Sequence, residues 1–244
     1  MKTIILDTET SGLTGKDRII EFGIVILNEQ FEIEYKGVDY CSIPFELSKE
    51  ASDYTGIKNS DLVNAKKIKD TPSFSVFQKY NNSENIVVIH NSWFDLYMLY
   101  LSHIKVECKI VDTLNCARHL YPDSEKHSLV YLMNEIVYKT NDKKTPFVQK
   151  HNAMDDCIVL LDLLKYMLQT NTMLDLLCMT DRWVIGFGKH KGKLWKDCDK
   201  RYLKWVHDKY ASENSPTQLY VKTLLKLPLC PQQQKMAEYL HIDC

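Results

Sequence analysis

Short apolar runs alternate with helical patterns along the first 178 residues of the chain. Runs rich in β-branched residues predict strands, and apolar residues at helical spacing predict helices. The predicted strands are residues 2–9, 19–27, 31–40, 86–89 and 109–112. The predicted helices are residues 71–80, 93–102, 113–120, 128–137 and 152–169, with short helices within 48–65, a loop over 138–149 and a last helix ending near 178. Strands that alternate with helices after an antiparallel meander indicate an α/β domain with a mixed sheet.

The charge balance changes near residues 179–181. The whole chain has a net charge of −1, but from residue 181 onward 12 Lys and Arg stand against 7 Asp and Glu, so this part carries +5 and the rest −6. We therefore predict a first domain over residues 1–178 and a small basic domain over 181–244 that binds a polyanion such as nucleic acid. So short a domain needs large buried side chains, and its predicted core contains Trp183, Trp195 and Trp205.

The remaining composition indicates an ordinary globular protein, 45% hydrophobic and 26% charged. No apolar run reaches the roughly 18 residues of a membrane span, and the N-terminus shows no signal peptide. The 8 cysteines are scattered without a C-x-x-C pair, which favours reduced, buried thiols over a disulfide framework or a zinc site. These features predict a soluble cytoplasmic protein that does not enter a membrane.

The first predicted strand ends in two carboxylates, Asp7 and Glu9. Residues two apart on a strand point to the same face, so the two side chains should lie together. Close carboxylates repel and raise each other's proton affinity unless a cation neutralises them, and Mg²⁺ prefers oxygen ligands of this kind. The pair therefore predicts half of a metal site, although strand-end acids in surface ion pairs would look the same in isolation.

Two further acids and a histidine occupy suitable positions. Asp95 follows the strand 86–89 at the start of a helix, and Asp156 borders the apolar face of the helix 152–169. His151 immediately precedes that helix. Each has a simpler interpretation when taken alone: an acid favoured by the helix dipole, a partly exposed helix acid, and a helix cap.

Taken together, these residues form three motifs. The motifs are Asp7-Thr8-Glu9, His90-Asn91-x-x-Phe94-Asp95 and His151-x-Ala153-x-x-Asp156. They resemble the three exonuclease motifs of the DEDD family, and the histidine spacing is similar to its DEDDh branch. The resemblance covers about residues 1–178 and implies an RNase H-like (DnaQ-like) mixed sheet flanked by helices.

The C-terminal part carries a second resemblance. Phe187-Gly-Lys-His-Lys-Gly-Lys193, followed by Tyr202-Leu-Lys-Trp205, resembles the small domain that follows the nuclease domain in exodeoxyribonucleases of the X type. Both resemblances together imply a metal-dependent 3′–5′ exonuclease that hydrolyses DNA from 3′ ends and releases 5′-mononucleotides.

The family resemblance assigns roles to the site residues. Asp7, Glu9, Asp95 and Asp156 would hold two Mg²⁺ ions, for which Mn²⁺ can substitute, and His151 would be the general base. Two such ions stabilise the attacking and leaving oxygens of an in-line displacement at phosphorus.

The nucleic-acid contacts are predicted in two groups. Leu13 and Phe94, with Thr10 and Asn91 beside them, should contact the terminal nucleotides of the substrate. The glycine-bounded loop offers lysines to phosphates, although the same lysines would also suit a solvated hairpin tip. They are Lys189, Lys191 and Lys193.

Other functions share these motifs. The chain could degrade RNA, because nothing in the sequence reports on a 2′-hydroxyl group. Degradation of matched DNA and RNA oligomers would discriminate between the two substrates. It could also assist proofreading or repair by docking on a polymerase or repair partner, which co-purification would test. A purely binding subunit is disfavoured, since binding alone gives no reason to keep clustered, mutually repelling carboxylates.

Overall fold

A five-stranded mixed sheet forms the centre of the first domain. The computed structural model describes residues 1–138, 152–211 and 215–242. The strand order is β3-β2-β1-β4-β5. The strands are β1 (Thr3–Thr10), β2 (Ile19–Leu27), β3 (Ile33–Tyr40), β4 (Ile86–Ile89) and β5 (Lys109–Asp112).

The first three strands pair antiparallel as a meander, β4 pairs parallel to β1, and β5 pairs parallel to β4. Strands β2 and β4 are buried at every position, as expected for continuous apolar runs covered on both faces. β3 has no fully buried residue and forms one edge of the sheet. The carboxyl end of the central strand β1 lines a cleft, and substrates of open α/β sheets commonly bind at the carboxyl ends of the strands.

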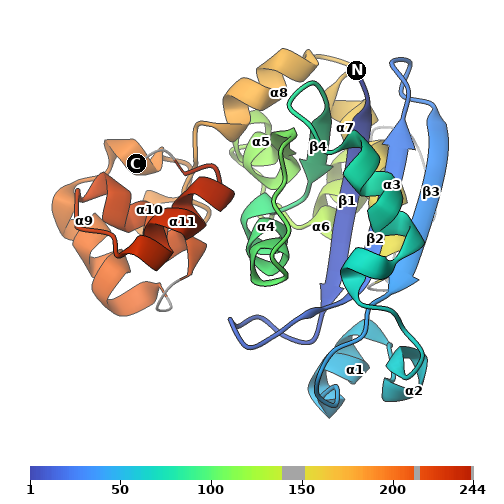
Figure 1. The fold of residues 1–244 in the computed structure, drawn as a ribbon. Coiled ribbons are helices and arrows are strands. Elements are labelled where there is room, and N and C mark those ends of the chain that lie inside the picture. The colour runs from blue at the N-terminus through green and yellow to red at the C-terminus, as the bar shows by residue number, and fades with distance from the viewer. Residues whose placement is uncertain (139–151, 212–214, 243–244) are drawn as a thin grey trace.

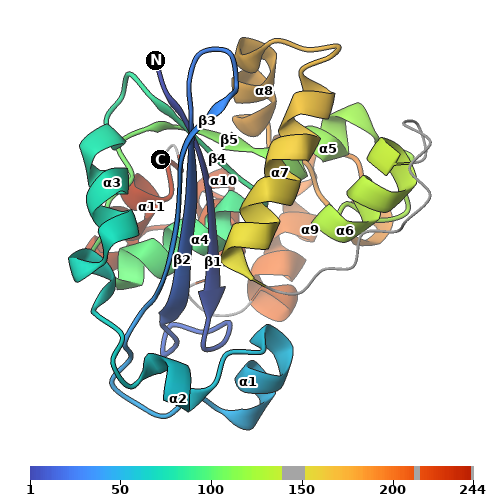
Figure 2. The same ribbon diagram turned by 90° about the vertical axis from the view of Figure 1, so that its right-hand side faces the viewer.

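Helices cover both faces of this sheet (Figures 1 and 2). On one face, α3 and α4 pack with side chains such as Phe74 and Phe77 against Phe22, whose ring lies 5.8 Å from that of Phe77. On the other face, α7 lays a leucine stripe over β1 and β2. The helices of the first domain are α1 (Lys49–Thr55), α2 (Asn59–Leu62), α3 (Pro72–Tyr80), α4 (Ser92–Leu101), α5 (Thr113–Leu120), α6 (Leu129–Leu132), α7 (Ala153–Met167) and α8 (Met173–Thr180).

Local sequence signals explain where the long helices begin. Thr71 caps α3 by accepting a hydrogen bond from the amide of Phe74, and Pro72 occupies the first helical position. Asn152 caps α7 through its side-chain oxygen, which accepts from the amides of residues 154 and 155. The predicted strands and these helices are confirmed to within a few residues.

One predicted helix is irregular. The segment 128–137 forms the short helix α6 and continues as the π-helix η2 (Met133–Tyr138). Nearly all of the predicted loop 138–149 lies outside the described residues, as does His151.

The C-terminal segment has a small core of its own and also packs against the first domain. Its buried core includes Ile185, Trp195 and Val206. Helices α10 and α11 join the larger core beside α4, and Trp183 lies against Trp93 with a ring separation of 3.9 Å. The elements are η3 (Gly188–His190), η4 (Trp195–Asp197), α9 (Lys200–Trp205), η5 (Val206–Tyr210), α10 (Pro216–Leu224) and α11 (Pro231–Tyr239), on the left in Figure 1.

These contacts refine the prediction for this segment. Trp195 is buried as expected, but the prediction was wrong for Trp205, which is 48% exposed. Its position on the short helix α9 turns the indole ring outward, whereas Tyr202 and Leu203 of the same helix face the core. The division at 178–181 remains a proposal, because the segment after it shares a core with α4.

The cysteines agree with the expected reduced state where they are described. Four of them, Cys41, Cys108, Cys116 and Cys157, are buried, and no disulfide joins any two cysteines in the described part of the chain. Among the described residues, every helix is too short or too polar to reach across a bilayer. The cytoplasmic location stays a prediction.

Candidate active site

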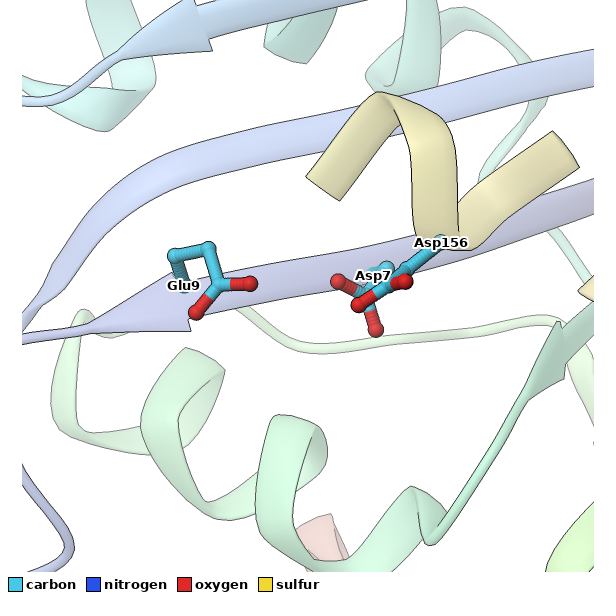
Figure 3. Close-up of side chains that lie close together, drawn as sticks. All are labelled: Asp7, Glu9 and Asp156. Carbon is cyan, nitrogen blue, oxygen red and sulfur yellow. The ribbon is translucent and has the colours of Figure 1, made fainter. Parts of the chain in front are cut away.

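Three carboxylates meet where β1 passes beneath the start of α7 (Figure 3). Asp7, Glu9 and Asp156 each offer an oxygen, and these oxygens lie within 4.8 Å of one another. Asp7 and Glu9 come from one strand, two residues apart, and Asp156 comes from the first turn of α7. The structure therefore brings together three of the four predicted ligands in a geometry that a single cation could bridge.

Asp95 completes the acidic group from the opposite side. It lies in the first turn of α4, is 3% exposed, and accepts a hydrogen bond of 2.7 Å from the Thr8 hydroxyl. Thr8 thereby ties α4 to β1 between the two carboxylates of the first motif. After burial, the charge of Asp95 is the largest cause that raises the pKa of Asp7, and both residues line the same cleft.

Burial and mutual repulsion perturb the whole group. Burial is the main reason why the pKa of Glu9 rises to about 8, and the charges of Asp156, Glu21 and Asp95 add to it. Burial likewise raises the pKa of Asp95 to about 7 and raises that of Asp7 well above its ordinary value. The raised pKa values mean that ionising these buried carboxylates costs free energy. A hard divalent cation would offset that cost, because its positive charge neutralises the carboxylates.

A residue that the sequence interpretation missed positions Asp156. Glu21 of β2 is 2% exposed, and its carboxylate accepts hydrogen bonds from the Ala153 amide at 2.7 Å and from the Asn152 side chain at 3.3 Å. Gly23 allows α7 to lie this close, because a Cβ at residue 23 would come within 2.9 Å of the Ala153 backbone. The only sequence signal was an acidic residue inside an otherwise apolar strand.

We expect Glu21→Ala to weaken magnesium activation and to lower exonuclease activity by about 10- to 100-fold, the range found for groups that orient metal ligands. The loss follows because the first turn of α7, which carries Asp156, loses its anchor. Magnesium titrations of activity would measure the half-saturation point, with the exposed Glu84→Ala as a matched control. Glu21→Gln should restore part of the effect, since its amide oxygen can still accept from Ala153. Parent-like magnesium dependence in Glu21→Ala would contradict the anchor role.

Asp112 performs a similar task for α4. Its buried carboxylate accepts hydrogen bonds from the amides of Asn91 and Ser92 and from the Ser92 hydroxyl, with distances between 2.8 and 3.3 Å. Asn91 itself adopts φ 74°, the left-handed conformation that asparagine tolerates. This geometry sets the start of α4 and hence the place of Asp95.

Three of the four residues predicted to contact the terminal nucleotides, Thr10, Leu13 and Phe94, line a cleft of about 600 Å³ that contains all four carboxylates. Leu13 is 81% exposed and lies in this cleft with Phe94. Thr10 also lines it, but its hydroxyl donates to the Gly12 carbonyl at 2.8 Å and so holds the turn that carries Leu13. Tyr54, 65% exposed, is an additional aromatic wall that the sequence interpretation did not assign.

A second cleft continues from the same carboxylates toward the C-terminal segment. It shares Asp7, His90 and Asp156 with the first cleft and also includes Asn91, Gly186 and Lys191. Its other lining residues are Leu114, Arg118, Glu125, Lys126, His127, Ser128 and Leu129. Burial lowers the pKa of His90 to about 4, so the positive charge of this cleft comes from arginine and lysine.

The three predicted phosphate-binding lysines differ in their surroundings. Lys191 donates to the carbonyls of Ser124 and Glu125 at 3.0 Å and thereby ties the C-terminal turn to the loop after α5. Lys189 lies over the ring of Tyr202 at 5.9 Å, and Lys193 is exposed. Their contact with nucleic acid stays a prediction.

Comparison with known proteins gives this geometry its context. The family profile described as Exonuclease matches residues 4–164. The chain is 30% identical over 186 residues to the DNA polymerase III subunit epsilon of Buchnera aphidicola (Schizaphis graminum strain), covering 70% of this chain and 75% of that protein. It is 34% identical over 164 residues to the PolC-type DNA polymerase III of Thermotoga maritima, but this match spans only 11% of that polymerase and 64% of this chain.

Solved structures share the fold. Exonuclease X in complex with 5′-overhanging duplex DNA superposes with a TM-score of 0.56 at 24% identity, covering 73% of this chain and 99% of that one. The nuclease domain of 3′hExo bound to rAMP gives a TM-score of 0.54 at 20% identity, covering 69% and 92%. With the profile match over residues 4–164, this chain belongs to the exonuclease family, as a DEDDh 3′–5′ exonuclease of the DnaQ-like, RNase H-like fold.

Proposed function

We propose that this protein hydrolyses DNA from its 3′ ends in a Mg²⁺-dependent reaction and releases 5′-mononucleotides. The observation that carries this proposal is the group of carboxylates from Asp7, Glu9 and Asp156, gathered within 4.8 Å inside a cleft of about 600 Å³. That volume suits a small-molecule-sized ligand such as a terminal nucleotide. The epsilon subunit of a DNA polymerase among the relatives, and the duplex DNA in the exonuclease X complex, favour DNA as the substrate.

The metal site follows from the carboxylates. Asp7, Glu9 and Asp156 would hold one cation, and Asp7 with Asp95 a second, which Mn²⁺ could occupy in place of Mg²⁺. Such a pair would stabilise the charge on the attacking and leaving oxygens of the displacement. Thr8, Glu21 and Asp112 keep the ligands in place before substrate arrives, so little reorganisation is needed during the reaction.

The proton transfers are assigned to His151 and solvent. His151 would take the proton from the attacking water as its oxygen bonds to phosphorus. The bond between phosphorus and the 3′ oxygen then breaks, the 3′ oxygen takes up a proton, and the shortened strand keeps a 3′-hydroxyl. Leu13, Phe94 and Tyr54 would hold the terminal base by stacking and apolar contact, which tolerates any sequence.

We expect His151→Ala to slow turnover by about a hundredfold or more, in the range of general base catalysis. The concentration of Mg²⁺ that gives half-maximal activity should stay the same, because the carboxylates remain. Single-turnover hydrolysis at saturating Mg²⁺ would measure the effect, and added imidazole should restore part of the rate. A large loss of magnesium affinity in this variant would contradict the assignment.

A digestion panel tests the proposed function. Single- and double-stranded DNA and RNA, labelled at the 3′ or the 5′ end, are incubated with the pure full-length chain and Mg²⁺ or Mn²⁺. The proposal expects early release of labelled mononucleotide from 3′-labelled DNA and progressive shortening of 5′-labelled DNA. Folded protein that leaves every end intact would overturn it.

RNA is the second candidate substrate, favoured by the fold shared with the nuclease domain of 3′hExo, which was solved bound to rAMP. The same panel decides between them through the ratio of rates on DNA and RNA of equal sequence. Docking on a polymerase or repair partner remains a further prediction, for which co-purification is the test.

A further inference from the structure

A pocket of about 560 Å³ lies on the C-terminal segment, apart from the catalytic carboxylates. The turn that includes Phe187 and Lys189 forms one side of it, and Tyr202 and Trp205 of α9, with Arg201, form the other. Nothing in the exonuclease chemistry uses this pocket. It is nevertheless close in volume to the cleft of about 600 Å³ at the carboxylates, and its walls combine aromatic rings with cationic side chains.

The aromatic side chains form a stacked series at the surface. Trp205 is 48% exposed and Tyr210 52% exposed. The ring of Trp205 lies 5.8 Å from that of Tyr202 at 26°, and Phe187 stacks on Tyr210 at 4.1 Å and 18°. Neighbouring rings fix the orientation of the indole, so it presents a preformed flat surface that would lose little side-chain entropy on binding a ligand.

The charge around these rings favours an anionic ligand. Lys189 and Arg201 line the pocket, and neither forms a salt bridge with any other residue that the structure describes. The carboxylate in the pocket, Asp199, accepts the Tyr202 amide at 3.0 Å and so caps α9. A ligand that offers both a π face and a negative group therefore matches the pocket, and a nucleotide offers both.

Unsatisfied polar groups lie beside the same rings. The buried hydroxyl of Tyr202 and both ring nitrogens of His190 have no hydrogen-bond partner among the described residues, and the two rings lie 4.2 Å apart. Of these two residues Tyr202 lines the pocket, and His190 lies against its ring. Buried polar groups are normally satisfied, so such an exception beside a pocket points to a ligand that supplies the missing bond. Gly188, in the same turn, adopts φ 64°, the left-handed conformation that favours glycine.

A basic route connects the active site to this part of the molecule. The second cleft is lined by Asp7 and Asp156, by the cationic Arg118 and Lys126, and by Gly186 and Lys191 of the C-terminal segment. Gly186 lets the guanidinium approach, since a Cβ there would come within 2.4 Å of Arg118. Residues 186–191 thus contribute to both hollows, so a strand that follows the cleft away from the carboxylates arrives at the turn that forms the aromatic pocket.

We propose that the Trp205 pocket binds a nucleotide of the single-stranded substrate, upstream of the bond that is cut, by stacking a base on the indole and pairing phosphate with Lys189 and Arg201. The proposal rests on the proposed exonuclease function for the direction of the strand. It makes the C-terminal segment part of the substrate-binding surface, and it accounts for the exposure of Trp205. The pocket should increase affinity only for substrates that are long enough to reach it.

The test compares a long and a short substrate. For Trp205→Ala in the full-length chain, we expect the KM for a 20-nucleotide single strand to rise about tenfold while kcat stays unchanged. A tenfold change corresponds to the binding free energy that one stacked base contributes. Hydrolysis of a dinucleotide should not change. Trp205→Phe should recover most of the affinity, because it keeps a stacking ring. Lys189→Ala should weaken long-strand binding and reduce its salt dependence, whereas Lys165→Ala, an exposed lysine on α7, should not.

Binding without cleavage separates this proposal from the exonuclease function. A fluorescent 20-nucleotide strand is titrated in EDTA and followed by anisotropy. Weaker binding by a folded Trp205→Ala variant supports the pocket even if the parent cleaves nothing, an outcome in which only the exonuclease function fails. Parent-like binding and parent-like KM for the long strand in Trp205→Ala would overturn the pocket while the exonuclease function stands. The same result is expected if the pocket is a docking site for a protein.

Discussion

Asp156→Asn is expected to lower metal-dependent hydrolysis by about a thousandfold or more, equivalent to roughly 4 kcal/mol of transition-state stabilisation. Asp156 is 3% exposed and contributes one of the three carboxylates that lie within 4.8 Å of one another. The amide keeps the shape of the side chain but removes the negative charge that binds the cation. Initial rates of mononucleotide release across a magnesium titration would measure the loss.

The chain offers a matched control one residue away. Asp155 lies on the same helix turn, is exposed, and is not one of the three clustered carboxylates. Asp155→Asn should therefore keep activity within about twofold of the parent. Equal losses in both variants would show that the effect comes from the helix terminus and its dipole. Parent-like activity in Asp156→Asn would remove this residue from the site.

The stability of the metal-free protein should fall as the pH rises from about 4.5 to about 8. Glu9 has its pKa raised to about 8 in the folded protein, against an ordinary value of 4.5. Within this window the folded state holds a proton that the unfolded state has released, so each increase in pH favours unfolding. The contribution is complete at low pH and is lost as the pH rises through the folded pKa. Over the full range it is on the order of 3–5 kcal/mol, a large part of the stability of an ordinary domain.

Magnesium should reverse this trend, because the ion binds the ionised carboxylates. Thermal unfolding in EDTA should show a lower Tm at pH 8 than at pH 6, and the increase in Tm on adding Mg²⁺ should be larger at pH 8. Glu9→Gln should flatten the pH dependence in EDTA and reduce the magnesium effect. A Tm in EDTA that rises between pH 6 and pH 8 would contradict the proposed electrostatics.

Some residues act through contacts with segments that are distant in the sequence, and the sequence alone did not predict these contacts. Glu21 holds the start of α7 across 132 residues, and nothing near Glu21 in the sequence indicates that contact. The hydrogen bonds that Asp112 makes to the start of α4 span 20 residues and are likewise invisible to a local pattern. Packing also decides the position of Trp205. A tryptophan in so short a segment is expected in the core, but the packing of α9 leaves this one exposed.

The sequence alone determined the strands, the long helices and the candidate carboxylates of this protein. Those features depend on short-range rules. Apolar runs are buried, side chains two apart on a strand share a face, and an acid at a strand end or at the border of an apolar helix face stands out from its neighbours in the sequence. Only the tertiary structure decided that Asp7, Glu9 and Asp156 meet within bonding reach of one ion, that the C-terminal segment packs on α4, and that an aromatic pocket faces outward. Those outcomes depend on how separate elements pack, and packing is settled by contacts between residues that no local pattern relates.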